Sequence, residues 1–573
     1  MVYKSEPDAL KECVAYFSME IGISHKIPTY SGGLGILAGD LLKSFADMKI
    51  AMIAVTLLNN KGYFNQKIDH YGNQIEEPVN WNPKDHLVLL PNEVYLTIEG
   101  RNVKIKIWKG AIYGISGYAI PVYFLDTNCK ENNEYDKTLT SYLYGGDKTY
   151  RLCQEMILGI GGIKALESLG YKKIKKYHLN EGHAALLTIE LLKKTYKEAL
   201  THEESYSVES VKEKCIFTTH TPVAAGHDVF DISLFKKLLG NYVPEFIINK
   251  ISPNSQVSMT LLGLYMSKYV NGVAKRHKDI TKEMFPEYNI DSITNGIHPM
   301  TWISPSFKNL YEEYIPCWAQ DPFSLRYALS IPKERISNAH TESKMHLLNE
   351  IKQSTGASFH HKRFTIGFAR RFTQYKRPDL LFTDINKLKQ IAQKLGDIQI
   401  VLAGKAHPND TKGKELIKHI ISISNQINQE NSKLKIVFIQ NYDMRIARLM
   451  ISGSDLWLNT PKSPNEASGT SGMKAALNGV PQISTLDGWW LEGHIENVTG
   501  WSIGPVDLAS ENNNSDYLEA KSLYDKLENT IIPTFYSNTD KWIEIMRHSI
   551  AINASFFNTY RMAQQYIANA YHQ

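Results

Sequence analysis

A glycine-rich turn that leads a lysine into a helix is the strongest chemical signal in the chain. The segment runs from Asn465 to Gly479, reads NEASGTSGMKAALNG, and lies between two expected strands, 455–459 and 480–485. Its glycines let the backbone approach a ligand closely, and the free N–H groups at a helix start bind an anion. Lys474 follows this anion site directly. Such a lysine suits a pyridoxal phosphate enzyme, because the amine bonds to the cofactor while the turn holds the cofactor's phosphate.

An isolated G-x-x-x-K motif more often places its lysine on the surface of an amphipathic helix, so other segments must decide between the two interpretations. These segments are YFSMEIG near Tyr16, SGGLGILAGD from Ser31, KGYFNQKI from Lys61, LNEGH from Leu179, FTTHTP from Phe217, TNGIHP from Thr294, RRFTQYKRP from Arg370 and LAGKAHP from Leu402. Together with EASGT and MK in the lysine segment, and in this order, they resemble the α-glucan phosphorylases, which act on glycogen, starch and maltodextrin.

Composition agrees with a large intracellular enzyme. The chain has 573 residues and a net charge of +5 that is spread without basic blocks, so we expect no nucleic-acid or membrane partner. Its five cysteines are scattered and form no C-x-x-C pair, which favours reduced thiols and no structural metal site. The N-terminus is charged where a signal peptide needs an apolar core, and no apolar stretch is long enough to cross a membrane. We therefore expect a soluble, cytoplasmic protein.

Short apolar strands alternate with helical patterns along the chain, which is typical of parallel sheets with crossover helices. The first half is less regular, and its period-two stretch from Leu87 to Leu125 predicts an antiparallel meander inserted into or beside the sheet. The second half alternates regularly and predicts a doubly wound domain: strands FTIGFAR, IQIVLAG, KIVFIQ and DLWLN separate helices at 378–395, 411–429 and 444–452.

The turn residues of TNGIHPMTW place a domain boundary between Asn295 and Trp302. We expect an N-terminal α/β domain at 1–298, which carries the glucan and phosphate-loop side, and a C-terminal Rossmann-like domain at 299–540, which carries pyridoxal phosphate. Helices at 541–573 are expected to pack across both.

Polar candidates lie at or just past the ends of expected strands, where open parallel sheets bind ligands. With the resemblance, this predicts an α/β fold of two Rossmann-like doubly wound domains facing a central cleft, the glycosyltransferase B-type fold. The residues at the strand ends are Glu20, Asn180, His220, Arg370, Lys405 and Asn459.

A phosphate site separate from the cofactor is suggested by Arg371 and Lys376, since a guanidinium and an ammonium together hold a tetrahedral dianion well. On this segment alone, a solvated basic stretch at a helix start is equally compatible. In the family, the matching arginine and lysine hold the substrate phosphate. The resemblance adds backbone N–H groups from a glycine loop, which on its own could be an ordinary strand-to-helix turn: Gly32, Gly33 and Leu34.

Sugar-binding residues are implied by the resemblance, with His220 near the reacting carbon. Glu181 and His183 belong to the same region, and the common family pattern has aspartate at Glu181, so the reach of this carboxylate stays open. His220 could instead cap backbone at a strand end, and His183 could instead be a satisfied core histidine. The remaining sugar-binding candidates are Asn295, Glu466, Ala467, Ser468 and Gly469.

Cofactor-binding residues are implied in the same way, with Lys474 as the covalent anchor. Aromatic residues at the matching ring positions are more often part of a core than of a cofactor pocket, so core packing stays open for Tyr16, Trp302 and Tyr442. The positions expected around the cofactor's phosphate are Gly33, Arg370, Thr470, Ser471 and Gly472.

The resemblance implies retaining phosphorolysis, in which inorganic phosphate attacks a terminal α-1,4-glucosyl unit of glycogen or maltodextrin and releases α-glucose 1-phosphate, or the reverse. The substrate phosphate would protonate the leaving oxygen, while Glu466 orients the sugar and Lys474 anchors pyridoxal phosphate. A retaining glycosidase would instead need two carboxylates flanking the bond, and the sequence alone cannot pair two.

Two other functions compete with this interpretation. A nucleotide-sugar glycogen or starch synthase shares the architecture and a G-G-L-G loop, but such enzymes usually carry a second glutamate where this chain has Lys474, and a lysine where it has Tyr30. A non-catalytic glucan-binding protein would need neither the lysine nor the phosphate-site cations.

Two departures from the family pattern limit the assignment. The first core strand begins by about Val14, so we expect no N-terminal regulatory extension, and the loop reads TSGMK where many members have TGNMK. The chain thus resembles the shorter, divergent phosphorylases. Glucan length, regulation and reaction direction stay open, and because members are commonly dimers, so does a homodimer.

Overall fold

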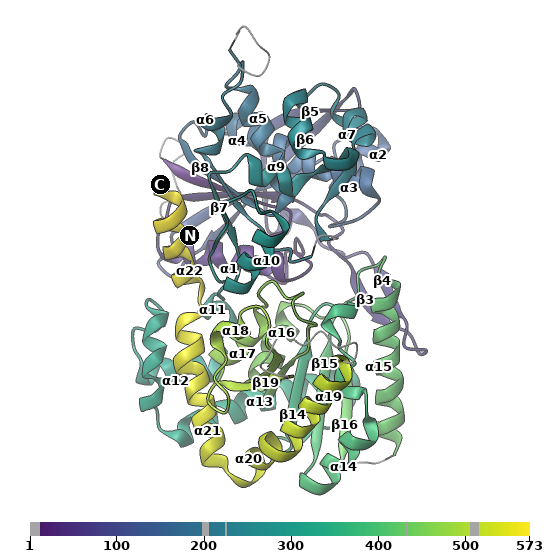
Figure 1. Ribbon diagram of the computed structural model, residues 1–573, viewed down its shortest axis with the longest axis vertical. Helices are drawn as coiled ribbons and strands as arrows, with labels where there is room; N and C mark the ends of the chain where they lie inside the picture. The colour runs from purple at the N-terminus through teal and green to yellow at the C-terminus, as the bar shows by residue number, and fades with distance from the viewer. Residues whose placement is uncertain (1–11, 198–204, 224–225, 431–432, 505–514, 573) are drawn as a thin grey trace. The chain divides into compact units, whose positions relative to one another are not determined.

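The chain folds into two compact α/β units, which confirms the predicted fold class. The computed structural model describes residues 12–197, 205–223, 226–430, 433–504 and 515–572 (Figure 1). None of the helices in these ranges is both long and apolar enough to cross a membrane. The first unit comprises Met1–Phe64, Pro78–Thr294 and Met562–Gln573, and the second comprises Asn65–Glu77 and Asn295–Arg561.

The first unit is built on a nine-stranded sheet in the order β13-β12-β9-β8-β1-β2-β7-β6-β5. The pairs from β13 to β7 are parallel, whereas β5, β6 and β7 pair antiparallel at one edge. The period-two stretch from Leu87 to Leu125 therefore forms the predicted meander. The strands are β1 (Cys13–Ser18), β2 (Met52–Leu57), β5 (Val88–Ile98), β6 (Arg101–Tyr113), β7 (Ala119–Asp126), β8 (Ile174–Asn180), β9 (Cys215–Thr218), β12 (Tyr269–Gly272) and β13 (Asp291–Ser292).

Each face of this sheet packs on its own apolar core, because successive side chains of a strand point to opposite faces. On β1, Ala15 and Phe17 belong to one core, whereas Val14 and Tyr16 belong to the other. The helices of this unit are α1 (Gly33–Asp47), α2 (Glu134–Thr138), α3 (Lys148–Met156), α4 (Gly162–Ser168), α5 (Leu187–Lys193), α6 (Val208–Lys212), α7 (Ile232–Leu239), α8 (Glu245–Ile251), α9 (Met259–Tyr265) and α10 (Lys275–Met284).

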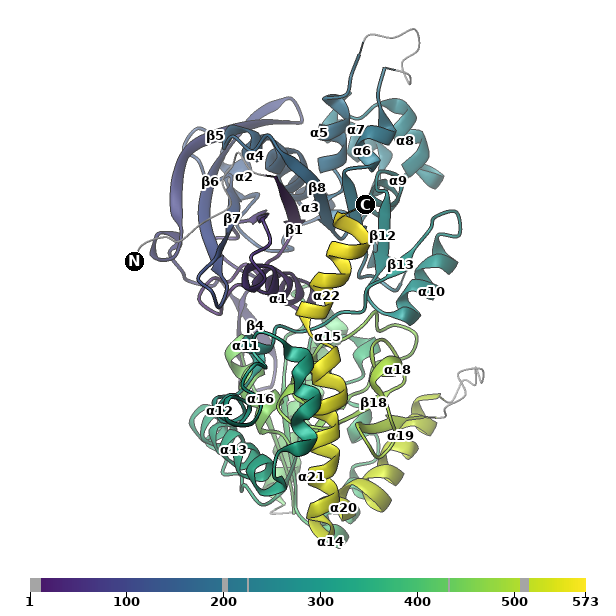
Figure 2. The same cartoon turned by 90° about the vertical axis from the view of Figure 1, so that its left-hand side faces the viewer.

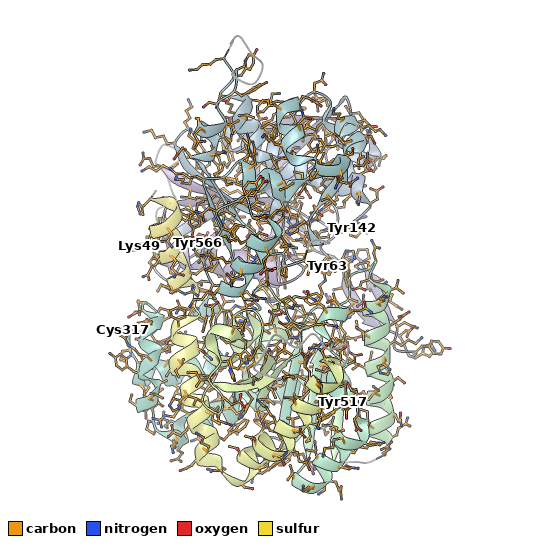
Figure 3. All side chains as sticks on the ribbon, in the orientation of Figure 1. Lys49, Tyr63, Tyr142, Cys317, Tyr517 and Tyr566 are labelled. Carbon is orange, nitrogen blue, oxygen red and sulfur yellow. The ribbon has the colours of Figure 1, made fainter. Side chains whose placement is uncertain are left out.

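The end of the chain returns to the first unit through α22 (Thr559–Tyr566), which lies beside α1 in both views (Figures 1 and 2). Tyr566, labelled in Figure 3, is buried in the same core as Tyr16. Its hydroxyl also lies 3.0 Å from that of Thr218 on β9. The last helix is thus fixed to the sheet by both apolar packing and a buried polar contact.

The second unit contains a parallel six-stranded sheet in the order β16-β15-β14-β17-β18-β19. Successive strands run outward from β14 on one side and from β17 on the other, so the strand order reverses between these two. Ligands of doubly wound sheets bind at such a switch point. The strands are β14 (Phe364–Ala369), β15 (Ile398–Ala403), β16 (Leu434–Ile439), β17 (Leu456–Asn459), β18 (Gln482–Thr485) and β19 (Gly500–Ile503).

Helices alternate with these strands, as the sequence pattern predicts. They are α11 (Pro299–Trp302), α12 (Pro305–Tyr314), α13 (Lys333–Thr355), α14 (Ile385–Leu395), α15 (Thr411–Gln429), α16 (Met444–Gly453), α17 (Ser471–Leu477), α18 (Trp490–Gly493), α19 (Ser515–Lys526), α20 (Ile532–Ser537) and α21 (Thr539–His548).

A hairpin from the first half of the sequence also belongs to the second unit. Its strands are β3 (Asn65–Ile68) and β4 (Gln74–Glu77). The Gln66 side-chain amide donates to the Gly404 carbonyl at 2.8 Å and accepts from the Asn441 N–H at 2.8 Å. The Gln74 amide both donates to the Ala406 carbonyl and accepts from its N–H. The two glutamines thereby hold the backbone on either side of Lys405.

A buried ion pair joins α13 to the start of β17. The Lys344 ammonium lies 2.5 Å from Asp455, and the side chains of both are only 2% exposed. Asp455 also accepts from the Thr365 N–H at 2.7 Å, and its second oxygen lies 2.9 Å from Nε2 of His340. The carboxylate therefore connects a helix with two neighbouring strands.

Replacing Lys344 by methionine should lower the unfolding midpoint of the second unit strongly, because it leaves the buried Asp455 carboxylate without its cation. Removing one partner of a buried pair costs about 3–5 kcal/mol. Urea unfolding followed by circular dichroism would measure the loss. The control is Lys308→Met, which breaks an exposed pair with Glu312 and should cost about 1 kcal/mol or less. Equal losses in the two variants would contradict a structural role for the buried pair.

Candidate active site

Lys474 lies in the second unit on α17, which begins directly after the glycine turn and between β17 and β18, as predicted. Its side chain is buried, since the residue is 8% exposed. The ammonium lies 3.7 Å from the centre of the Trp302 ring, and Trp302 is itself fully buried. The alternative of a solvated surface lysine is therefore wrong. A buried amine against an aromatic ring, at the carboxyl end of parallel strands, is positioned for covalent chemistry.

The glycines of this turn are required for two different reasons. Gly469 has a φ of +75°, a conformation that other residues adopt only with strain. A Cβ at Gly472 would lie 1.5 Å from the side-chain oxygen of Gln482, so a larger residue there would displace the Gln482 side chain. The Ser471 hydroxyl accepts from the Trp457 indole N–H at 3.1 Å. The turn is thus fixed in shape by packing within the protein.

Glu466, just before the turn, binds two cations with one oxygen. Its Oε2 accepts from Arg370 Nη2 at 2.6 Å and from Lys376 Nζ at 2.5 Å. Burial raises the pKa of this carboxyl, but the Arg370 and Lys376 charges outweigh burial and hold the pKa at about 2. Glu466 is therefore ionised at any physiological pH.

Arg370 is the arginine that the structure brings to Lys376, whereas the adjacent Arg371 side chain is exposed. Arg370 directly follows β14, and Lys376 ends the short turn η7 (Gln374–Lys376). The Nε and Nη1 atoms of Arg370 are buried and have no hydrogen-bond partner among the described residues. Because a buried guanidinium donor without a partner is costly, these atoms mark a place where an anion would be stabilised.

Asp487 supports this cluster and was not found from the sequence. Its carboxylate accepts from the Glu466 N–H at 2.8 Å and from the Gly488 N–H at 2.9 Å. Burial, together with the neighbouring Glu466 charge, raises the pKa of Asp487 to about 7. Asp487 follows the end of β18 by two residues, so the strand-end rule that selected Asn459 could have found it.

The cluster opens into a small pocket of the second unit. The Ser468 hydroxyl is buried there and has no hydrogen-bond partner within the described ranges. Such a hydroxyl can donate to, or accept from, a polyhydroxylated or anionic ligand. The pocket is lined by Arg370, Asn459, Pro461, Glu466, Ser468, Gly469, Gln482, Ser484, Asp487, Trp489 and Trp490.

Other predicted residues of the second unit lie apart from these contacts or contribute backbone only. Asn295 is buried, its carbonyl accepts from Arg561 at 2.9 Å, and its side-chain oxygen has no partner in the described structure. Tyr442, Ala467 and Thr470 are half-buried. The Thr470 carbonyl accepts from the Lys474 N–H at 3.2 Å.

The first unit gathers a second polar cluster at the ends of β8 and β9. The Glu181 carboxylate accepts from the His220 N–H at 2.7 Å and from the Thr221 hydroxyl at 3.0 Å. Burial raises the pKa of Glu181, but the surrounding histidines, His220 first, lower it overall. Glu181 has a φ of +72° and a ψ of +169°, a region that is strained for any residue with a side chain. Such strain is typical of functional sites.

His183 points to a different partner, since its Nε2 lies 3.2 Å from Asp228. Asp228 in turn accepts from the Arg151 guanidinium at 2.9 Å. Tyr16 is fully buried in the core, where its ring lies edge-on to that of His178 at 4.8 Å. The structure therefore joins Glu181 to His220 by a hydrogen bond, pairs His183 with Asp228, and places Tyr16 in the core.

The glycine loop at the start of α1 is fastened by Glu20. Oε2 of Glu20 accepts from the Ser31 N–H at 2.6 Å and from the Gly32 N–H at 3.3 Å. The Gly32 N–H is thus already bonded within the protein. Gly33 and Leu34 form the first residues of α1, and a Cβ at Gly33 would meet no atom of the described residues within 4 Å. Space for a ligand is therefore present at Gly33.

Comparison with known proteins places the chain in a family. A model of the carbohydrate phosphorylases matches residues 243–573. The chain is 38% identical to a maltodextrin phosphorylase of Thermococcus litoralis, over 98% of this chain and 70% of that protein. It is also 34% identical to a glycogen phosphorylase of Aquifex aeolicus, over 98% of this chain and 87% of that protein. This protein belongs to the carbohydrate phosphorylase family.

Exchanging Glu466 for glutamine should strengthen the binding of inorganic phosphate at least tenfold, because the carboxylate that neutralises Arg370 and Lys376 is lost while the side-chain shape is kept. Titration calorimetry of both proteins with phosphate would measure the change. The matched control is Glu519→Gln, which removes the carboxylate paired with the buried Arg377 and should leave phosphate binding unchanged. Unchanged or weaker binding in the Glu466 variant would show that these cations do not form an anion site.

Proposed function

We propose that this protein catalyses the retaining phosphorolysis of terminal α-1,4-glucosyl units of glycogen or maltodextrin, with inorganic phosphate as the acceptor and α-D-glucose 1-phosphate as the product. The observation that carries the proposal is the buried position of Lys474 in the glycine turn, against Trp302. Family membership supports it, because two relatives that each match 98% of the chain are named maltodextrin phosphorylase and glycogen phosphorylase.

The two competing functions explain this part of the structure less well. A nucleotide-sugar synthase would use a carboxylate at the position of Lys474, where this chain buries an amine. A non-catalytic glucan-binding protein gains nothing from a buried lysine, nor from an arginine with unbonded buried donors beside Glu466. Both features have a use in an enzyme that handles an aldehyde cofactor and phosphate.

The donor set of the second unit fits pyridoxal phosphate. Lys474 would hold the cofactor covalently, because burial next to Trp302 excludes water from the amine. Arg370, with two unbonded guanidinium atoms, and the backbone of the turn at Thr470, Ser471 and Gly472 would bind its phosphate. When bound, the cofactor supplies a phosphate group that supports proton transfer by the substrate phosphate.

Glu466 cannot act as the general acid that protonates the leaving glucan oxygen. Its pKa of about 2 keeps it ionised, and two cations bind the same oxygen. The carboxylate is also a weak nucleophile in this state, because its charge is compensated. We infer that Glu466 accepts hydrogen bonds from sugar hydroxyls with its remaining lone pairs, and that the proton comes from the substrate phosphate.

Lys376 and Arg371 are proposed to hold the substrate phosphate. Lys376 is half of the cation pair at Glu466, so an incoming dianion would compete with a carboxylate for the same ammonium. Arg371 is exposed, which leaves its guanidinium accessible to a ligand. In the first unit, His220 is proposed to contact the sugar, and the backbone of the glycine loop to contact phosphate.

A paired assay tests the reaction itself. Supplied with a maltooligosaccharide and inorganic phosphate but no nucleotide, the protein should release glucose 1-phosphate, and NMR should identify it as the α-anomer. The parallel reaction supplies ADP-glucose or UDP-glucose with the same glucan. Chain extension from the nucleotide sugar without phosphorolysis would overturn the proposal, and a β-anomer would overturn the retaining course.

The cofactor assignment is tested by chemical trapping. After incubation with pyridoxal phosphate and reduction with borohydride, peptide mass mapping should find the adduct on Lys474. Lys405 is the matched control, because burial lowers the pKa of its amine to about 8 and makes it the competing nucleophile in this unit. The adduct should persist in Lys405→Ala and disappear in Lys474→Ala. An adduct on Lys405 alone, or on neither lysine, would exclude Lys474 as the anchor.

A further inference from the structure

Three adjacent strands of the first unit end in one row of polar side chains. In the registers of β1 with β8 and of β8 with β9, Ser18 pairs with Asn180, and Asn180 pairs with Thr218. His220 follows β9 by two residues and lies over the same edge. Ser18 and Asn180 are 0% and 1% exposed, so their hydrogen bonds must be made within the protein.

The hydrogen bonds along this row run in only one direction. The Ser18 hydroxyl donates to the Glu20 carbonyl at 2.7 Å, which uses its single proton. Ser18 Oγ can therefore only accept from Asn180, whose Nδ2 donates to it at 3.0 Å. This fixes the orientation of the Asn180 amide, and its oxygen faces Nε2 of His220 at 2.7 Å. Since that oxygen can only accept, His220 must carry its proton on Nε2.

The consequence is a single tautomer of the imidazole. With a proton on Nε2, neutral His220 has a lone pair on Nδ1, which no hydrogen bond among the described residues uses. Burial lowers the pKa of His220 to about 4, although the Glu181 charge raises it, so the ring is neutral at physiological pH. Nδ1 is then an acceptor for an O–H group and cannot donate to an oxygen.

We propose that Ser18 and Asn180 are positioning residues that hold His220 as the neutral Nε2–H imidazole, so that Nδ1 accepts a hydrogen bond from a hydroxyl of the sugar substrate. The inference rests on the proposed function for the identity of the ligand, but the tautomer itself is a property of the unliganded chain. A site that accepts from a hydroxyl discriminates strongly against an analogue without it, because the buried acceptor is left unpaired.

Several charged or titratable groups act on the same ring. Glu181 lies on the backbone side of His220 and favours its protonated form, whereas His183 after β8 and His277 on α10 oppose it. His178 on β8 feels the His220 charge, and its own pKa is lowered by burial to about 3. Apart from Glu181, these neighbours are histidines. Asn180 is the side chain that contacts Nε2, so substituting Asn180 changes the charge next to that nitrogen.

Asn180→Asp tests this positioning role, because the substitution keeps the side-chain shape and places a carboxylate against the His220 Nε2–H. The His220 pKa should rise by about one to three units, as for a histidine gaining a carboxylate partner. Protonation of the ring adds a proton to Nδ1, so Nδ1 no longer accepts a hydrogen bond. For phosphorolysis, kcat/KM of the variant should therefore fall as the pH drops from 8 towards 5. In the wild type, His220 stays neutral over this range and should cause no such fall.

The tautomer is measured directly by NMR on protein labelled with nitrogen-15 histidine, with the His220 signals assigned from the spectrum of His220→Gln. Wild-type protein should show the Nε2–H pattern, and Ser18→Ala, which frees the Asn180 amide to turn, should show a mixture of the two tautomers. The matched control is Asn271→Asp on β12, a fully buried asparagine whose oxygen accepts from Thr218 instead of His220. Its pH profile should follow the wild type.

An Nδ1–H tautomer in the wild type overturns the inference whatever the enzyme does, as does an unshifted pH profile in a folded Asn180→Asp protein. If that variant does not fold, the Ser18→Ala spectrum tests the inference instead. A pure Nε2–H signal in Ser18→Ala would show that Ser18 does not position the Asn180 amide. Absence of phosphorolysis in the wild type would instead reject the proposed function and leave the tautomer result standing.

Discussion

The second unit's site depends on the balance of charge at Glu466. A single buried carboxylate holds Arg370 and Lys376, two cations that come from separate elements after β14. Its backbone is in turn fixed by Asp487, which follows β18. Without the carboxylate the cations would repel each other in a medium that screens poorly, and without the cations burial would raise the pKa of the carboxyl group. The geometry of the pocket therefore follows from mutual neutralisation.

Both units place their polar groups by the same principle. Parallel strands bring their carboxyl ends to one edge, so residues distant in sequence become neighbours there. In the first unit this aligns Ser18, Asn180 and His220, and in the second it aligns Arg370, Asn459 and Asp487. Strands such as β1, β2, β14 and β15 are buried along their whole length. The carboxyl edge of the sheet is thus the first position along such a strand where a polar side chain can reach a ligand.

Much of this arrangement could be predicted from sequence, because alternation of apolar strands and helices is a local pattern. The meander after Leu87, the doubly wound second half and the glycine turn before Lys474 all follow from periodicity or from turn residues. The choice between Arg370 and Arg371 could not be predicted, since it depends on backbone angles after the strand. The orientation of the Asn180 amide depends on which atom of Ser18 holds a proton, which has no signature in the sequence.

The hairpin β3–β4 shows that the two units are not separable modules of the chain. Its glutamines are synthesised early, but the backbone groups that they bind, at Gly404, Ala406 and Asn441, follow several hundred residues later. A ribosome must therefore complete most of the polypeptide before the hairpin can pack against these backbone groups. A gene fragment that begins at Asn295 would leave the loop around Lys405 without its amide partners. A chimaera of two homologues joined at that boundary would need the hairpin and the second half from the same parent.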